Sequence, residues 1–399
     1  MDDTTQATVP APAVRATLLQ VFFVSLSLML FELDLVRLFS ILIRNLSFFV
    51  LAISLFGIGL GGIYAQFWRA RLKRSDELPG GVHYLPLLLG ISAVVALFVF
   101  SQVSFAGTTE QTNLRIFWKM TMLFLVASLP FFWGSMFISM VFAARSADAS
   151  RLYFGDLIGA SVGCLAAVLL LQWLGGLTLP FFIAALAVLP ATLLAPPNRR
   201  RFACGAVVLL AAIGLGAANH VHQFVNIRSN SVVAEREKLF VGWNFFSRIT
   251  VEEEPWFSGW RVSDAYEGPF PEYCRIRQDG HAPAFIAKFD GDFDEVDHLR
   301  YDITALPYQM LEDIEKVLVI GAGGGRDILT AKLYDTPRVD AVELNPITVN
   351  DVMLGAFREY SGNVYGLEGV RPIVSNGRTY VQATDEHYAL IYTSLADTL

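Results

Sequence analysis

Long runs of apolar residues alternate with short polar segments over the first half of this chain. Each run holds about 17 to 29 residues, and a helix needs roughly 20 to cross the hydrocarbon core of a bilayer. We therefore predict a polytopic α-helical membrane domain of about seven spans over residues 1–221. The runs are Thr17–Ile43, Leu46–Trp68, His83–Ser104, Ile116–Ala144, Tyr153–Leu174, Thr178–Ala195 and Phe202–Ala218.

The pattern changes beyond about residue 222, where short β-like runs with aromatic residues and turns replace the long apolar stretches. The pair Asp279-Gly280 stands between the last two of these runs, and Asp-Gly between strands is a strong hairpin signal. We predict a small antiparallel β unit with a linker helix over residues 222–310, and the helix extends over Tyr301–Leu311. The β-like runs are Ser247–Val251, Arg275–Arg277 and Pro283–Ile286.

Residues 311–399 alternate strand-like and helix-like segments, an order that predicts parallel strands in one doubly wound α/β sheet. Val317–Ile320 is an apolar run typical of a buried parallel strand, and Glu343 closes a second strand. A helix is predicted over Ile347–Arg358. Further strands are predicted at Arg371–Ser375 and Ala389–Thr393.

The two halves differ in charge. Residues 1–219 hold 14 Lys and Arg against 9 Asp and Glu, and residues 220–399 hold 16 against 28, so the net charges are +5 and −12. An acidic second half offers no electrostatic footprint for a polyanion, so we expect no nucleic-acid partner. The partner expected of the first half is the lipid bilayer. The three cysteines have no metal-ligand spacing, so neither a disulfide nor a metal site is expected.

Among the ionisable residues within the apolar runs, four call for an explanation: Glu32, Asp34, Arg37 and Asp156. Such groups usually face the interior of a helical bundle and pair with one another. Asp34 and Arg37 are three residues apart and can meet on one helix face, as a structural ion pair. The alternative interpretation is a path for a substrate or a proton.

Glycines recur at the spacing that lets membrane helices pack closely. Gly155, Gly159 and Gly163 form a GxxxGxxxG face, and Asp156 beside it is expected to bond across a packed helix. The run Gly57 to Gly62 indicates a similar close contact.

Positive charge is concentrated in the loops after the second, fourth and sixth apolar runs, so the positive-inside rule places those loops in the cytoplasm. With seven spans the second half of the chain would then lie outside, where nucleotide cofactors are generally lacking. One of the two shortest runs, Thr178–Ala195, is interrupted by Pro180 and Pro190. If one of the last two runs does not span, the second half is cytoplasmic, and the cofactor site described next favours that solution.

The segment from Lys316 to Pro346 gives the strongest functional signal, because it is typical of a strand, a glycine turn, a helix and a second strand with a terminal carboxylate. Glycines let the backbone turn tightly and approach a ligand closely. Glu343 lies about 22 residues past Gly321, a spacing at which a carboxylate can take the ribose hydroxyls of a nucleoside.

Elimination narrows the choice of cofactor. A dinucleotide fingerprint beginning at Gly321 needs glycine or alanine where this chain has Arg326. A phosphate-binding loop is excluded because no Gly-Lys-Ser/Thr follows. A turn that packs against an uncharged nucleoside remains, as for S-adenosylmethionine (AdoMet) or decarboxylated AdoMet.

VLVIGAGGGRD with VELNP, then SNGR from Ser375 and YALIYTSLADT from Tyr388, resembles the AdoMet methyltransferase-type core of spermidine synthases. FELDLVRLF and RLYFGDLIGASVG in the first half resemble bacterial multi-span spermidine-synthase-like membrane proteins. The resemblance implies a Rossmann-like AdoMet-binding domain over residues 311–399 and a place in the bacterial inner membrane. The cofactor-binding residues it implies are Gly321, Gly323, Gly324, Gly325, Asp327, Glu343, Asn345, Asn376 and Gly377.

The departures from the family concern the acceptor side. The family's catalytic base falls on Ser394, and only its second acid is kept, as Asp397. The family's turn aspartate falls on Gly324, and its adenine-contacting aspartate on Asn376, whose carbonyl oxygen can still accept from an exocyclic amine. The Tyr-His-Glu group that holds the polyamine has no counterpart near residues 299–301. A serine cannot take the proton of an amine at neutral pH without a partner.

Two functions follow. The first is a membrane-embedded transferase of aminopropyl or methyl groups to a small-molecule acceptor such as an amine. The second is a catalytically degenerate, nucleoside-sensing domain attached to a transporter-like helical bundle. Methyltransferase-type sheets in the family have about seven strands and only four can be placed before Leu399, so we expect a fragment, or a second chain, such as another copy, that completes the sheet.

Two further features have mainly structural interpretations. His281 and His298 are expected to be solvated side chains of a surface segment, although each could be a ligand or a base. The acidic run FDGDFDEVD from Phe289 lacks the glutamate of a calcium loop, so we expect a solvated loop or a rim that attracts amines.

Overall fold

The computed structural model describes residues 11–42, 48–71, 80–104, 113–227, 236–255, 257 and 262–393. The chain forms two compact units, each described by itself. The helical unit comprises Met1–Glu235 with Asn244–Phe246, and the sheet unit comprises Arg236–Trp243 with Ser247–Leu399.

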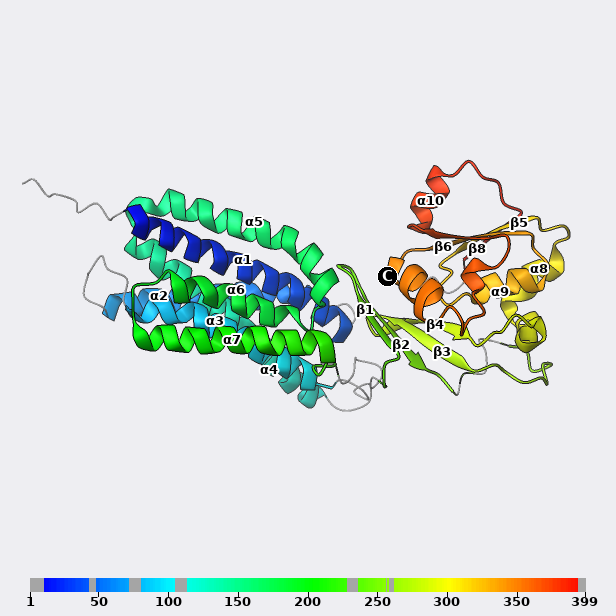
Figure 1. The fold of residues 1–399 in the computed structure, drawn as a ribbon, viewed down its shortest axis with the longest axis horizontal. Coiled ribbons are helices and arrows are strands. Elements are labelled where there is room, and N and C mark those ends of the chain that lie inside the picture. The colour runs from blue at the N-terminus through cyan, green and yellow to red at the C-terminus, as the bar shows by residue number, and fades with distance from the viewer. Residues whose placement is uncertain are drawn as a thin grey trace, which may run out of the picture. The chain divides into compact units, whose positions relative to one another are not determined.

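The helical unit contains a long helix at each of the seven apolar runs (Figure 1). In the described part of the chain, six of them are long and apolar enough to cross a membrane. The exception is the 15-residue α6, about 22 Å long at 1.5 Å per residue against a hydrocarbon core of roughly 30 Å. The helices are α1 (Ala11–Leu42), α2 (Phe49–Arg71), α3 (Leu85–Gln102), α4 (Asn113–Ala144), α5 (Ala149–Leu174), α6 (Leu179–Leu193) and α7 (Arg199–His222), with short 3₁₀ turns at Gly80–Tyr84 and Ser146–Asp148.

Glycines set the closest helix contacts, which confirms the packing expected of the GxxxGxxxG face. A methyl group placed on Gly159 would lie 2.3 Å from the carbonyl oxygen of Phe22, so α5 packs directly on the backbone of α1. Gly57 and Gly61 bring α2 equally close to α4. Gly59 faces open space.

The sheet unit begins with an antiparallel sheet of order β1-β2-β3-β4. The Asp279-Gly280 hairpin forms as predicted, with φ of 51° and 75° at its two turn residues. The short edge strand β1 was not predicted. The strands are β1 (Phe240–Trp243), β2 (Arg248–Glu253), β3 (Tyr273–Gln278) and β4 (His281–Ala287).

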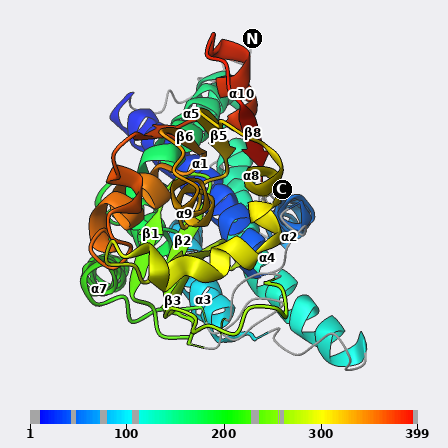
Figure 2. The ribbon, with the colours of Figure 1, turned by 90° about the vertical axis from the view of Figure 1, so that its right-hand side faces the viewer.

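A second, four-stranded parallel sheet of order β7-β6-β5-β8 contains the strands predicted after residue 315. Helix α10 (Gly377–Ala383) lies on one side of this sheet, and α9 (Arg326–Leu333) lies on the other (Figures 1 and 2). The strands are β5 (Lys316–Ile320), β6 (Arg338–Glu343), β7 (Val370–Val374) and β8 (Leu390–Thr393).

Two predicted helices differ in the structure. The continuous helix predicted over 301–311 is wrong, because a 3₁₀ turn at Ile303–Ala305 precedes the five-residue α8 (Leu306–Met310), whose first turn holds Pro307. Proline fits the first turn of a helix but not its interior. The second helix forms as the π-helix η5 (Ile347–Ala356), which departs from helical geometry at Gly355. The remaining 3₁₀ segments are η3 (Phe293–Tyr301) and η6 (Val364–Gly366).

The two sheets share one hydrophobic core. Ile249 and Ile286 of the antiparallel sheet are buried in the same cluster as Val317 and Val339 of the parallel sheet. The cluster continues into α9 through Ile328. The antiparallel sheet therefore supports the parallel sheet and the glycine turn between β5 and α9.

Candidate functional site

The glycine turn joins β5 to α9 at the carboxyl end of the parallel sheet. Gly321, Gly323 and Gly325 have φ of 80°, 48° and 87°, values that L side chains adopt only with strain. The amide of Gly321 still donates to the carbonyl of Val342, at 2.8 Å, so the turn starts in register with β6. The backbone of the turn is therefore fixed before any ligand binds.

Glu343 ends β6 beside this turn. Its Oε2 accepts from the amide of Gly323 at 3.0 Å, and its Oε1 accepts from the amide of Asn345 at 3.0 Å. The side chain is only partly buried. A carboxylate has about four acceptor sites, so two remain for donors such as ribose hydroxyls.

Packing explains two of the glycines better than a ligand does. A methyl group on Gly324 would lie 2.1 Å from the carbonyl oxygen of Phe285, so β4 passes directly against the turn. A methyl group on Gly325 would lie 2.7 Å from a methyl of Val364. The absence of a side chain at Gly324 thus lets the antiparallel sheet approach the turn.

Asn345 is fully buried and structural. Its amide nitrogen donates to the Ser247 hydroxyl at 2.6 Å, and its carbonyl oxygen accepts from the amide of Ile347 at 3.2 Å. These bonds tie the end of β6 to the start of β2 and to the start of η5. A direct role in holding a cofactor is not visible in this arrangement.

Asn376 and Gly377 follow β7. The Asn376 carbonyl oxygen accepts from the amides of Arg378, at 3.0 Å, and Thr379, at 3.4 Å, and so caps α10. Gly377 lies against the end of β5, since a methyl group there would be 2.4 Å from a methyl of Ile320. The structure therefore brings Gly377 to the end of the strand that enters the glycine turn.

Asp327 lies in the first turn of α9 and is 5% exposed. It interacts electrostatically with Tyr365, whose hydroxyl donates to the carbonyl of Gly323 at 2.8 Å. Burial, together with Glu343 and Asp327, raises the pKa of Tyr365 well above its usual value. Tyr365 therefore stays protonated and is a permanent donor to the turn. The sequence carried no local signal for it.

His298 is buried, at 1% exposure, so the expectation of a solvated side chain is wrong. Its Nε2 shares a 2.6 Å hydrogen bond with the hydroxyl of Tyr273, and rings of Tyr266 and Phe270 lie within about 6 Å of its own. Burial lowers the pKa of His298 to about 4, so the ring is neutral at neutral pH. His281 is partly buried.

The acidic run is organised by bonds within itself. The Asp290 carboxylate accepts from the amide of Asp292, and the Asp292 carboxylate accepts from the amide of Asp294. Asp290, Asp292, Asp294 and Glu295 are exposed, whereas Phe289 and Val296 of the same run are buried. The predicted catalytic residues Ser394 and Asp397 lie outside the described residues.

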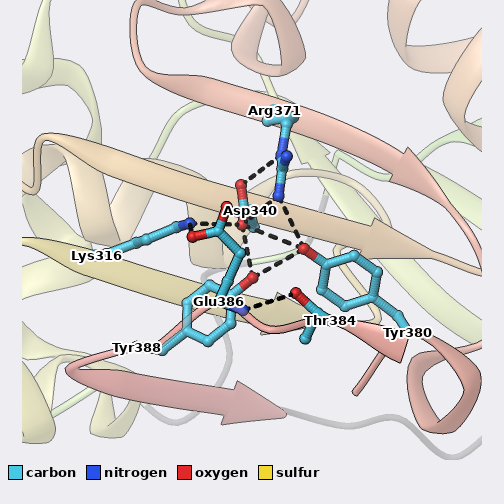
Figure 3. A network of polar contacts seen from close by, with 7 residues as sticks. All are labelled: Lys316, Asp340, Arg371, Tyr380, Thr384, Glu386 and Tyr388. Atoms are coloured by element: carbon cyan, nitrogen blue, oxygen red, sulfur yellow. Dashed lines mark hydrogen bonds and ion pairs between the residues drawn. The ribbon is translucent and has the colours of Figure 1, made fainter. Parts of the chain in front are cut away.

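A second polar network, missed by the sequence reasoning, lies at the amino end of the same parallel sheet (Figure 3). Asp340 of β6 accepts from Nε and Nη2 of Arg371, both at 2.8 Å, and from the hydroxyl of Tyr388 at 2.7 Å. Tyr380 and Lys316 lie 3.3 Å from the same carboxylate. The signal that could have revealed it is a carboxylate inside the otherwise apolar stretch Val339–Val342.

The four polar residues predicted to lie within the membrane, Glu32, Asp34, Arg37 and Asp156, have three different environments. Ser25 of α1 donates to the carboxylate of Asp156 on α5, so the expected bond across a helix contact forms. Ser54 of α2 donates to Glu32 at 3.0 Å. Neither carboxylate oxygen of Asp34 has a hydrogen-bond partner in the described structure, so the predicted pair with Arg37 is not made as a hydrogen bond.

Comparison of the chain with protein-family models, with curated proteins and with solved structures found no match in any of the three.

Proposed function

We propose that the sheet unit binds AdoMet or decarboxylated AdoMet and that the protein is a membrane-embedded, spermidine-synthase-like transferase. The observation that carries the proposal is the contact between Glu343 and Gly323, which places a partly exposed carboxylate against a turn of positive-φ glycines. Such a pair holds a nucleoside by its ribose and leaves room for a close approach to the backbone.

The strand order supports the same proposal. The order β7-β6-β5-β8 is, in chain order, the third, second, first and fourth parallel strands. This is the first part of the Rossmann order, in which ligands bind outside the carboxyl ends of the strands. The glycine turn and Glu343 both lie at that end.

The neutral, buried His298 belongs to η3, which packs against α9, the helix that follows the glycine turn. An acceptor amine must lose a proton on transfer, and Asp397 remains the proposed contact for it, with Ser394 beside it. The acceptor class is a small molecule such as an amine.

The cellular setting is part of the proposal. Six membrane-crossing helices would return the chain to the side on which it started, and the short α6 would then not cross. The sheet unit would lie in the cytoplasm of a bacterial cell, attached to the inner membrane, where AdoMet is made.

Calorimetric titration of the detergent-solubilised full-length protein with AdoMet, decarboxylated AdoMet and NAD tests the binding claim. We expect binding of one or both AdoMet forms and none of NAD, because Arg326 occupies the position of the third fingerprint glycine. Glu343→Ala should weaken binding roughly 10- to 100-fold, the effect of losing hydrogen bonds to a charged group. The exposed Glu312→Ala is the matched control. Lack of AdoMet binding by the folded wild-type protein would refute the proposal.

A second candidate is a nucleoside-sensing domain on a transporter-like bundle. It needs the same nucleoside contacts but no acceptor site, so the capping role of the Asn376 oxygen, which two backbone amides engage, applies equally to both functions. Incubation with AdoMet forms and a panel of polyamines, lipids and small amines separates the two functions. Release of 5′-methylthioadenosine or S-adenosylhomocysteine supports the transferase, and tight binding without either product supports the sensor.

A further inference from the structure

The carboxyl group of Asp34 is the most isolated ionisable group of the helical unit. The residue is 0% exposed, and neither carboxylate oxygen has a hydrogen-bond partner in the described structure. It lies within α1, inside the stretch Val14–Leu42 that is long and apolar enough to cross a membrane. Buried polar groups are normally hydrogen-bonded, so an orphaned carboxyl here calls for a physical explanation.

The neighbouring carboxyl groups show what a partnered group looks like in the same bundle. Asp156 accepts from Ser25 across the contact between α1 and α5, and Glu32 accepts from Ser54 across the contact between α1 and α2. Asp34 is two residues from Glu32, which puts it on a different face of α1. No comparable donor reaches that face in the described residues.

Charges on the packed helices do not compensate Asp34 either. The sequence of α6 contains no ionisable residue, and that of α4 contains only Arg115 and Lys119, both in its first turns. In α5 the charged residues are Arg151, in its first turn, and Asp156, which is itself acidic; α2 contains only Arg69 and Arg71, in its last turn, and α3 contains none. Arg37, one turn further along α1, interacts electrostatically with Asp34 but forms no hydrogen bond with its oxygens.

An ionised carboxylate without hydrogen bonds is strongly disfavoured in a low-dielectric interior, whereas the protonated acid is an ordinary polar group. A metal ion would need several oxygen or nitrogen ligands, and no group of three His, Cys, Asp or Glu side chains that could hold one occurs among the described residues. A proton needs only the carboxyl group itself. Intramembrane acids of this kind mark proton-handling sites.

We propose that Asp34 is a proton-binding site inside the helical unit, occupied by a proton at neutral pH. The site is independent of the cofactor site of the sheet unit. It gives the bundle a group that can release its proton only when a change in helix packing brings water or a donor to it.

Infrared difference spectroscopy of the full-length protein at pH 7 and pH 8 tests this. The spectrum of Asp34→Asn is subtracted from that of the wild type, and Asp148→Asn, beside the exposed Arg151, serves as the matched control. We expect the Asp34 difference to contain the carbonyl stretch of a protonated carboxyl group, and the Asp148 difference to contain only carboxylate bands.

A carboxylate band at both pH values in the Asp34 difference would overturn the proposal. Failure of Asp34→Asn to fold while Asp148→Asn folds would also overturn it, because an amide is close in size and charge to a protonated acid. Helical content by circular dichroism and the elution volume in detergent report folding of each variant.

Discussion

The two ends of the parallel sheet show opposite uses of polar groups. At the amino end, Asp340 is surrounded by two cations and two tyrosine hydroxyls, and its acceptor sites are filled. At the carboxyl end, Glu343 accepts from two backbone amides and keeps acceptor sites open beside glycines of positive φ. The dense network around Asp340 has the character of a structural clamp, whereas the sparsely used carboxylate of Glu343 is the one proposed to bind a ligand.

The amino end of the parallel sheet also contains a hollow. A space of ≈ 440 Å³ is lined by residues that include Arg371, Tyr380 and Glu386, next to the Asp340 network. Two of its charged lining residues are already paired with neighbours outside the lining, since Glu386 contacts Lys316 at 2.7 Å and Arg371 contacts Asp340 at 2.8 Å. The volume alone does not make it the cofactor site, because the carboxyl ends of parallel strands are where such ligands bind.

The largest effect is expected from a substitution that disrupts the network around Asp340. Asp340→Asn should leave Lys316 and Arg371 without their carboxylate and destabilise the sheet unit by about 3 kcal/mol. Amide exchange of β5 and β6, followed by mass spectrometry, should quicken roughly 100-fold, while AdoMet affinity of the folded fraction stays unchanged. Glu386→Ala, which removes only an exposed partner of Lys316, is the control and should not change exchange. Unchanged exchange in Asp340→Asn would show that the network does not stabilise the sheet.

The pH dependence of the stability of the sheet unit should distinguish the contribution of His298 from that of Asp340. Burial lowers the pKa of His298 to about 4 from about 6.5, so the unfolded chain binds more protons between these values. Stability contributed by the neutral ring is complete above pH 6.5 and is lost as the pH falls towards 4, by about 3 kcal/mol. His298→Gln should flatten this part of the exchange-against-pH profile, and the exposed His387→Gln should not. The same slope in all three proteins would contradict a neutral, buried His298.

Asp340 should act at lower pH. Burial raises its pKa, but the hydrogen bonds from Arg371, Tyr388 and Lys316 outweigh burial and hold the pKa below its usual value. Its contribution is therefore present above the unfolded-state pKa, near 3.9, and is lost as the pH falls through the lower folded-state pKa. Asp340→Asn should reduce the pH dependence below about 4, to which Glu252 with its lowered pKa also contributes, and leave that between 4 and 6.5 unchanged. If Asp340→Asn instead removed the pH dependence between 4 and 6.5, both pH ranges would have to arise from the Asp340 network.

The smallest effect on stability is expected at the glycines of the helical unit. There the close helix packing predicted from the glycine spacing can be tested directly. Gly159→Ala should destabilise the bundle by about 1–3 kcal/mol, because the added methyl meets the Phe22 backbone. Gly59→Ala, whose methyl would meet nothing within 4 Å, is the matched control. The midpoint of thermal unfolding in detergent should be lowered in Gly159→Ala only. Equal midpoints would argue against close packing of α5 on α1.

The elements that the local sequence determines were predicted from the pattern of residues along the chain. The apolar runs gave the helices of the first unit, and Asp279-Gly280 gave the hairpin because its turn needs positive φ. The run Val317–Ile320 and the strand ended by Glu343 appeared where predicted. The continuous helix over 301–311 failed because the proline at 307 starts a new helix.

Contacts between distant segments could not be read from the pattern. The burial of His298 depends on Tyr273, 25 residues earlier, and the requirement for Gly324 depends on the backbone of Phe285. Asn345 was predicted to bind the cofactor, and its hydrogen bond to Ser247, 98 residues away, could not be read from the local pattern. In each case the partner lies in, or directly before, a strand of the antiparallel sheet.

The central claim is that Glu343 receives the ribose of a bound nucleoside. The most direct measurement is a cycle of titrations of wild type and Glu343→Ala with 5′-methylthioadenosine and its 2′,3′-dideoxy analogue. We predict that removing the hydroxyls weakens wild-type binding roughly 10- to 100-fold and leaves binding by the variant nearly unchanged. Equal weakening in both proteins, or no weakening in the wild type, would contradict the assignment.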